Sequence, residues 1–303
     1  MRHAIGWCAV ALVTLASSFW AFWGVNEAFH EGWCKPYLWM RLLQLAAYLG
    51  PSMVLCALTA LSVRWPRAGA TLFVLVSVTI GALIIADNAH FGLFTSTILT
   101  VLPALVGLLF FFGRPTPRFV AYAVSVGIPL VIILVFGAEP LARVSTRFDD
   151  GDRGVRLVEG NGITLLWAPA GPGWTRDGLV TWDDAIARAR RLTEDGTALA
   201  DEPQDIWRLP SREEIVRSLT RGNRNAGGTW DALSERPSYT RRPDKESPLW
   251  DPISSLIYLW TADEASKDRA WIVVYHGGVF AKPKALGSSS NGFRAVRRPP
   301  VEQ

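Results

Sequence analysis

The chain has 303 residues, of which 50% are hydrophobic, and its formal net charge is +4. Seven of the 31 lysines and arginines and three of the 27 aspartates and glutamates precede Gly137, so the remaining chain carries 24 of each and no net charge. The basic face that nucleic-acid binding requires is therefore not expected, and we predict no nucleic-acid partner.

Five apolar segments occupy the first half of the chain. Each has about the length that a helix needs to cross the roughly 30 Å hydrocarbon core of a bilayer. The sequence therefore predicts an N-terminal all-α membrane domain over residues 1–137, with the lipid bilayer as its partner. A cleaved signal peptide is the alternative for the first segment, but Trp20 and Trp23 stand where a cleavage site needs small residues. The five predicted helices cover about 4–23, 38–63, 68–86, 91–112 and 119–136.

The arginines between these segments predict the orientation. If the helices alternate in direction, one side of the membrane receives Arg2, Arg64, Arg67, Arg114 and Arg118. Cytoplasmic loops carry the excess of such cations, so we predict a cytoplasmic N-terminus. An odd number of helices then places the C-terminal domain outside the cytoplasm. The expected location is the bacterial cytoplasmic (inner) membrane, with a periplasmic or extracellular domain.

The second half is predicted to be a tether, 138–160, followed by an α+β domain, 161–303, with two helices and a mainly antiparallel sheet. Ser211 and Glu214 form the pattern of a capping box and predict a helix over 212–221 that Gly222 closes. A second helix is expected from a cap at Thr181 to about Leu192. The predicted strands cover 163–167, 206–209, 255–262, 270–280 with a turn at 276–278, and 292–297.

Five short motifs in this half carry a family resemblance. They are V-T-W-D-D-A at 180–185, W-R-L-P-S-R-E-E at 207–214, L-W-T-A at 259–262, A-W-I-V-V-Y at 270–275 and G-F-R-A-V-R at 292–297. In this order they resemble the Lcl C-terminal domain family, which is similar to the formylglycine-generating-enzyme branch of the C-type-lectin-like fold. The resemblance covers residues 160–298 and implies that fold there. The membrane half resembles no characterised family.

The resemblance implies a binding scaffold rather than an enzyme. Formylglycine-generating enzymes work through cysteines that bind copper, and their ergothioneine-pathway relatives hold iron with several histidines. The soluble domain has no cysteine and a single histidine, His276. Fold alone does not assign an activity. We therefore predict no catalytic residue and no cofactor, and we expect the motif residues Trp182, Trp207, Trp260 and Trp271 to belong to the core.

The irregular segment 223–252 is the predicted ligand-binding loop. Its aromatic and polar side chains suit the apolar face and the hydroxyl edge of a sugar. A solvated loop whose tryptophans fill the core is the plainer interpretation. A Ca²⁺ ion held by Asp244, Glu246 and Asp251 is a further possibility, since Ca²⁺ takes oxygen ligands. The candidate ligand-binding residues are Asn225, Trp230, Asp231, Tyr239, Asp244, Lys245, Glu246, Trp250 and Asp251.

A second candidate site lies at the outer membrane face. Glu27, His30 and Glu31 share one stripe if the first helix continues outward, and Asp87 and His90 end the third helix on the same side. Carboxylates and imidazoles together can bind a transition metal or relay protons. An interfacial polar cap is the plainer interpretation of the same residues.

Two classes of function follow. The first is a non-catalytic membrane protein that presents a lectin-like domain to an envelope glycan, a peptide or a protein partner. The second is a membrane enzyme or sensor whose metal or proton site lies at the outer membrane face, at Glu27, His30, Asp87 and His90.

Overall fold

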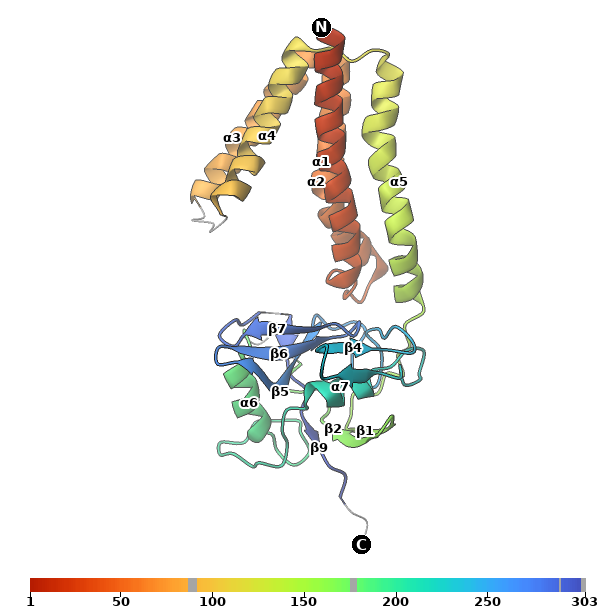
Figure 1. Ribbon diagram of the computed structural model, residues 1–303, viewed down its shortest axis with the longest axis vertical. Helices are drawn as coiled ribbons and strands as arrows, with labels where there is room; N and C mark the ends of the chain where they lie inside the picture. Colours follow the sequence, from red (N-terminus) through yellow and green to blue (C-terminus); the bar gives the residue numbers. More distant parts are fainter. Residues whose placement is uncertain (87–91, 175–178, 289, 301–303) are drawn as a thin grey trace. The chain divides into compact units, whose positions relative to one another are not determined.

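The computed structural model describes residues 1–86, 92–174, 179–288 and 290–300 (Figure 1). The chain divides into two compact units. The first contains Met1–Trp33 and Tyr37–Ala142, and the second contains Cys34–Pro36 and Arg143–Gln303. The first unit is helical and the second is rich in strands, as the sequence predicts.

Five helices within the described residues are long and apolar enough to cross a membrane, which confirms the predicted number. Two of them end several residues later than predicted. The first helix continues past residue 23 to His30 and the fifth continues past residue 136 to Ser145, so the predicted tether begins as helix. The drop in hydropathy predicts where a chain leaves the bilayer and not where its helix ends. The helices are α1 (Arg2–His30), α2 (Leu38–Arg64), α3 (Pro66–Ala86), α4 (Leu93–Phe112) and α5 (Arg118–Ser145).

Close backbone approach holds the helices of the first unit together. Gly107 of α4 faces α3, where an added Cβ would lie 2.9 Å from the carbonyl oxygen of Ala70. Small residues at such crossings let helix backbones pack closely, which matters in lipid because burial of apolar surface does not drive helix association there. Phe73 and Phe110 stack next to this crossing, with ring centroids 6.1 Å apart.

The second unit contains three sheets, in the strand orders β1-β2-β9, β3-β4 and β7-β6-β5-β8. All pairings are antiparallel except that of β5 with β8, so the mainly antiparallel prediction is confirmed. The elements are β1 (Arg156–Gly160), β2 (Ile163–Trp167), α6 (Trp182–Arg190), α7 (Arg212–Ser218), β3 (Thr229–Asp231), β4 (Arg236–Ser238), β5 (Tyr258–Ser266), β6 (Arg269–Val274), β7 (Val279–Pro283), β8 (Asn291–Gly292) and β9 (Val296–Arg297).

Several boundaries in the second unit differ from the predictions. Strand β1 lies inside the predicted tether and pairs with β2 through a turn at Asn161 and Gly162, both of which have positive φ. The segment 206–209 contributes only the isolated bridge of Arg208 to Val296. The predicted strand 292–297 is divided between two sheets, and the segment 223–252 contains the β3–β4 hairpin. Short strands of two or three residues carry too little alternation to be recognised from sequence.

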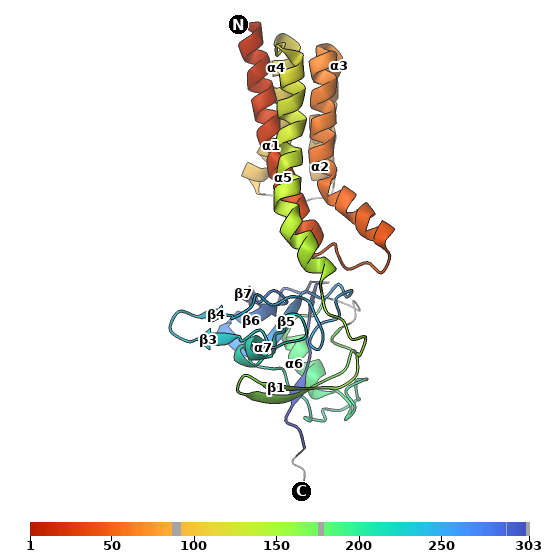
Figure 2. The ribbon, with the colours of Figure 1, turned by 90° about the vertical axis from the view of Figure 1, so that its right-hand side faces the viewer.

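The predicted capping box at Ser211 and the predicted cap at Thr181 are both present, and the Thr181 cap is also a capping box. The hydroxyl of Thr181 accepts from the N–H of Asp184, and that of Ser211 accepts from the N–H of Glu214, while each carboxylate accepts from the N–H of its cap residue. Helix α7 ends earlier than predicted, at Ser218, because Leu219 takes an extended conformation. Figure 2 shows α7 beside the β3–β4 hairpin, and the two are in contact.

Tryptophans form much of the core of the second unit. Trp182, Trp207 and Trp260 are buried, which agrees with their predicted place in the core. The indole N–H groups of all three donate to backbone carbonyl oxygens, at 2.8–3.0 Å. Trp271 is different, because it is only partly buried on β6. The fourth motif tryptophan therefore reaches the surface of the domain.

Candidate ligand-recognition site

The structure divides the nine predicted ligand-binding residues into buried and accessible ones. Asp244, Lys245, Glu246 and Trp250 are at most 2% exposed. Asp231 is exposed, and the half-buried ones are Asn225, Trp230, Tyr239 and Asp251. The buried members do not line a surface. Trp250 fills the core, as the plainer interpretation expects, but Asp244, Lys245 and Glu246 are charged side chains that are buried rather than solvated.

Asp244 is the centre of a buried ionic network. Its carboxylate accepts from Arg143 Nη1 at 2.8 Å, from Arg147 Nε and Nη2 at 3.1 and 3.0 Å, and from Arg221 Nη1 at 3.3 Å. Arg221 also donates to Glu246 at 2.9 Å. Three guanidiniums around one carboxylate compensate the cost of removing these charges from water. The network ties the domain entry at 143–147 to the loop.

The neighbours of Asp244 are held just as tightly. Burial lowers the pKa of Lys245 to about 7, the charge of Arg147 adds to this effect, and the Lys245 ammonium group donates to the carbonyl oxygen of Ser254. Burial also raises the pKa of Glu246, although Gly222 donates its N–H to that carboxylate at 2.5 Å. Hydrogen bonds within the domain thus hold both side chains in place in the loop.

Three of the half-buried candidates also fix loop conformation. Asn225 bridges the carbonyl oxygen of Arg217 and the N–H of Gly227, at 2.7 and 2.8 Å. Tyr239 donates to the carbonyl oxygen of Gly277 at 2.9 Å. Asp251 accepts from Arg153 at 3.1 Å. Their polar atoms already have partners within the domain, so a ligand gains little from them.

Trp230 belongs to a different arrangement, which we call the Arg212 platform and define as Arg212, Trp230 and Trp271. The two indole rings meet edge to face, with centroids 6.0 Å apart. The guanidinium carbon of Arg212 lies 4.6 Å from the centroid of Trp230 and 5.0 Å from that of Trp271. All three side chains are partly exposed. Within the described residues no hydrogen bond or ion pair engages the guanidinium donors of Arg212.

Three elements hold the platform in place. Arg212 is the first residue of α7 after the cap at Ser211, and its backbone N–H donates to the Asp263 carboxylate at 2.6 Å. Trp230 is the middle residue of β3, and Trp271 lies in β6, between the buried Ala270 and Ile272. The strand alternation that buries its neighbours turns Trp271 to the other face of the sheet.

The platform combines apolar faces with charged donors. Guanidinium–indole stacking orients a planar group of five N–H donors, which suits carboxylate and other oxygen acceptors. The indole faces offer a flat surface to an apolar ring. Arg212 and Trp271 were absent from the predicted site. The sequence does contain a signal for them, since both lie in the motifs that carry the family resemblance and Trp271 alternates with apolar residues. Spacing alone, however, does not show which side of a strand faces solvent.

The predicted metal sites have little support in the geometry. No three histidine, cysteine, aspartate or glutamate side chains in the described part of the chain gather closely enough to hold a metal ion. Asp244 is surrounded by arginines, which compete with a cation for its oxygens. Asp87 and His90 lie outside the described residues, so the second candidate site is described only at Glu27, His30 and Glu31.

Comparisons with protein-family models, with curated proteins and with solved structures gave no match for this chain.

Proposed function

We propose that this protein is a membrane-anchored recognition protein, in which five membrane-spanning helices present a soluble domain that binds a ligand of the cell envelope without catalysing a reaction. The observation that carries the proposal is the Arg212 platform. It places guanidinium donors that no described residue engages against two partly exposed indoles, on a support of one helix and two strands.

A glycan is the ligand class that the platform fits best. The apolar face of a sugar ring stacks on an indole, and its hydroxyl or acidic substituents accept hydrogen bonds from the guanidinium of Arg212. A peptide or a protein partner with an aromatic and an acidic side chain is the alternative within the same class of function.

The proposal includes a C-type-lectin-like scaffold for residues 161–303. Two capped helices and mainly antiparallel pairing support it, together with the burial of the motif residues Trp207 and Trp260. A scaffold of this kind keeps a binding surface rigid, so that a ligand loses little free energy in ordering it.

The proposal also includes an extracytoplasmic location of the soluble domain, in the inner membrane of a bacterium. It rests on the arginines at one end of the five helices and on the odd number of spans. An alkaline phosphatase fused after residue 303 should be active in intact cells, because this enzyme requires an oxidising compartment. An inactive fusion whose expression is normal contradicts this location.

A binding screen tests the function. The full-length protein, reconstituted in lipid nanodiscs, is offered to neutral and acidic glycans, to peptides and to envelope extracts, with empty nanodiscs as background. We expect the wild type to bind at least one glycan class and the Trp230→Ala/Trp271→Ala double variant to lose that binding. If the protein unfolds cooperatively, and is therefore folded, but binds no glycan, no peptide and no component of the extracts, the proposal is wrong.

A further inference from the structure

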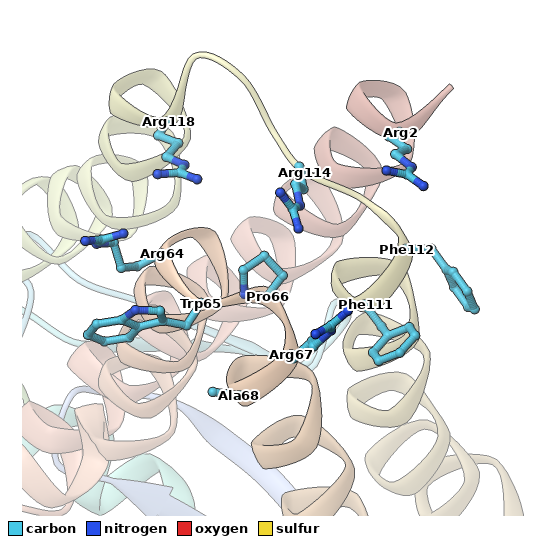
Figure 3. A pocket seen from close by; sticks show the side chains of 10 residues that line it. All are labelled: Arg2, Arg64, Trp65, Pro66, Arg67, Ala68, Phe111, Phe112, Arg114 and Arg118. Carbon is cyan, nitrogen blue, oxygen red and sulfur yellow. The ribbon is translucent and has the colours of Figure 1, made fainter.

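A pocket of about 680 Å³ lies at the end of the first unit where α1 begins, and five arginines line it. Figure 3 shows them arriving from separate segments. Arg2 comes from α1, Arg64 and Arg67 flank the corner between α2 and α3, and Arg114 and Arg118 flank the connection from α4 to α5. We call this the arginine pocket.

Short backbone contacts fix the shape of the arginine pocket. The N–H of Arg114 donates to the carbonyl oxygen of Arg2 at 3.0 Å, and the indole of Trp7 donates to the carbonyl oxygen of Thr116 at 3.0 Å. An added Cβ on Gly113 would lie 2.7 Å from the Cα of Gly6. The α4–α5 connection therefore packs directly on α1, and two of the arginines lie on segments that are hydrogen-bonded together.

The charge of the arginine pocket is not compensated within the described residues. None of the five arginines forms an ion pair there, and the described carboxylates of the first unit, Glu27, Glu31 and Glu139, are not among its lining residues. Like charges held in one pocket repel one another, so an anion that enters it is stabilised. The planar guanidinium matches a phosphate through two parallel hydrogen bonds.

A separate apolar groove of about 620 Å³ lies along α3 and α4. Phe111 lines both. The groove is bordered by Val74, Leu75, Leu105 and Leu108, and Thr71 is its one polar side chain among the described residues. A charged pocket that shares a wall residue with an apolar groove matches the two parts of a lipid.

We propose that the first unit binds an anionic phospholipid, with the phosphate-bearing headgroup in the arginine pocket and an acyl chain in the α3–α4 groove. Basic pockets between membrane helices bind such headgroups through the same chemistry. A role in membrane orientation alone requires cations in the loops, but it requires neither a pocket built by backbone contacts nor a groove that shares a residue with it. The site is independent of the Arg212 platform.

Lipid retention by the purified full-length protein tests the proposal. Native mass spectrometry in detergent counts the molecules of phosphatidylglycerol and of phosphatidylcholine, with identical acyl chains, that remain bound. Arg64→Gln/Arg118→Gln removes two charges of the pocket, and Ala104→Phe fills the groove without a change in charge. Arg41→Gln removes a charge of α2 that is not part of the pocket and serves as the matched control.

We expect the wild type and Arg41→Gln to prefer phosphatidylglycerol by at least about tenfold, and the double arginine variant to lose this preference. Ala104→Phe should weaken retention of the lipid but not of glycerol phosphate. Equal retention of both lipids by the wild type, or an unchanged preference in the double variant, overturns the proposal. If glycerol phosphate displaces the lipid completely and Ala104→Phe has no effect, the ligand is a free phosphate compound and the lipid proposal is wrong. If the Gln variant does not fold, Arg64→Lys/Arg118→Lys, which keeps the charge but not the paired hydrogen bonds, should show a reduced preference.

Discussion

The guanidinium carbon of Arg212 lies 4.6 Å from the ring centroid of Trp230, and no hydrogen bond to a described residue engages its donors. Arg212 follows directly on the cap of α7, so the same motif that starts the helix also places this cation at the surface. A motif that builds the fold thereby contributes to the proposed ligand site.

Asp244→Asn should destabilise the soluble domain by about 3–5 kcal/mol, because it leaves buried arginines beside a neutral amide. Chemical denaturation of the full-length protein, followed by near-UV circular dichroism, measures the free energy of unfolding. Asp205→Asn is the control, since the Asp205–Arg190 pair is more than half exposed and should contribute little to stability. Equal effects of the two substitutions contradict the buried network.

Lys245 should make the free energy of unfolding depend on pH above neutrality. Burial lowers its pKa to about 7 from an ordinary value of 10.5, so between these values the unfolded chain binds more protons than the folded chain. The free energy of unfolding contributed by this group therefore rises as the pH increases from about 7 towards 10. Lys245→Met removes this pH dependence, so the wild type should gain stability relative to the variant as the pH rises from 7 to 9. Parallel profiles contradict the assignment.

Glu214 should contribute to acid sensitivity. Burial opposes its ionisation, but hydrogen bonds from Arg208 and from the N–H of Ser211 outweigh burial and lower its pKa below 4.5. The stabilisation is thus present above pH 4.5 and is lost as the pH falls through the lowered pKa. Glu214→Gln should lose less stability than the wild type between pH 6 and pH 3. Glu194→Gln, on an exposed turn, is the control, and its free energy of unfolding should change with pH as that of the wild type does. If Glu214→Gln and Glu194→Gln change the pH dependence equally, the effect does not come from the cap.

Gly113→Ala should destabilise the membrane unit by about 1–3 kcal/mol, because the added methyl group must displace the backbone of α1 at Gly6. The melting temperature of helical circular dichroism in detergent measures the effect. Gly127→Ala in α5 is the matched control, as nothing lies within 4 Å of its added Cβ. If both variants melt at the wild-type temperature, the contact between the α4–α5 connection and α1 is not tight.

The sequence predicts the elements that depend on local patterns. Uninterrupted apolar runs identify the five membrane helices, and the spacing of Ser211 and Glu214 identifies the cap of α7. Helix ends are less predictable, because α5 continues to Ser145 on residues whose hydropathy no longer indicates membrane. The two-residue strands β8 and β9 are fixed by partners far away in the chain and have no local signature.

The candidate site is only partly predictable for the same reason. Asp244 is an acidic residue in an irregular loop, where ligand-binding residues are often found, but two of its three ion pairs among the described residues are with Arg143 and Arg147, about a hundred residues earlier. Nothing near Asp244 in the sequence indicates that it is buried. Trp230 is retained from the predicted set, and its partners Arg212 and Trp271 come from two other segments that only the tertiary fold brings together.

The affinity of the full-length protein for the best glycan of the screen is the most direct measurement of recognition by the Arg212 platform. Titration calorimetry in nanodiscs should give a dissociation constant that increases at least about tenfold in Arg212→Gln and in Trp230→Ala, in keeping with hot-spot substitutions at binding sites. Phe280→Ala, which removes an aromatic ring that is 52% exposed on β7, should leave it unchanged. Unchanged affinity in both platform variants, or an equal loss in Phe280→Ala, contradicts recognition at this site.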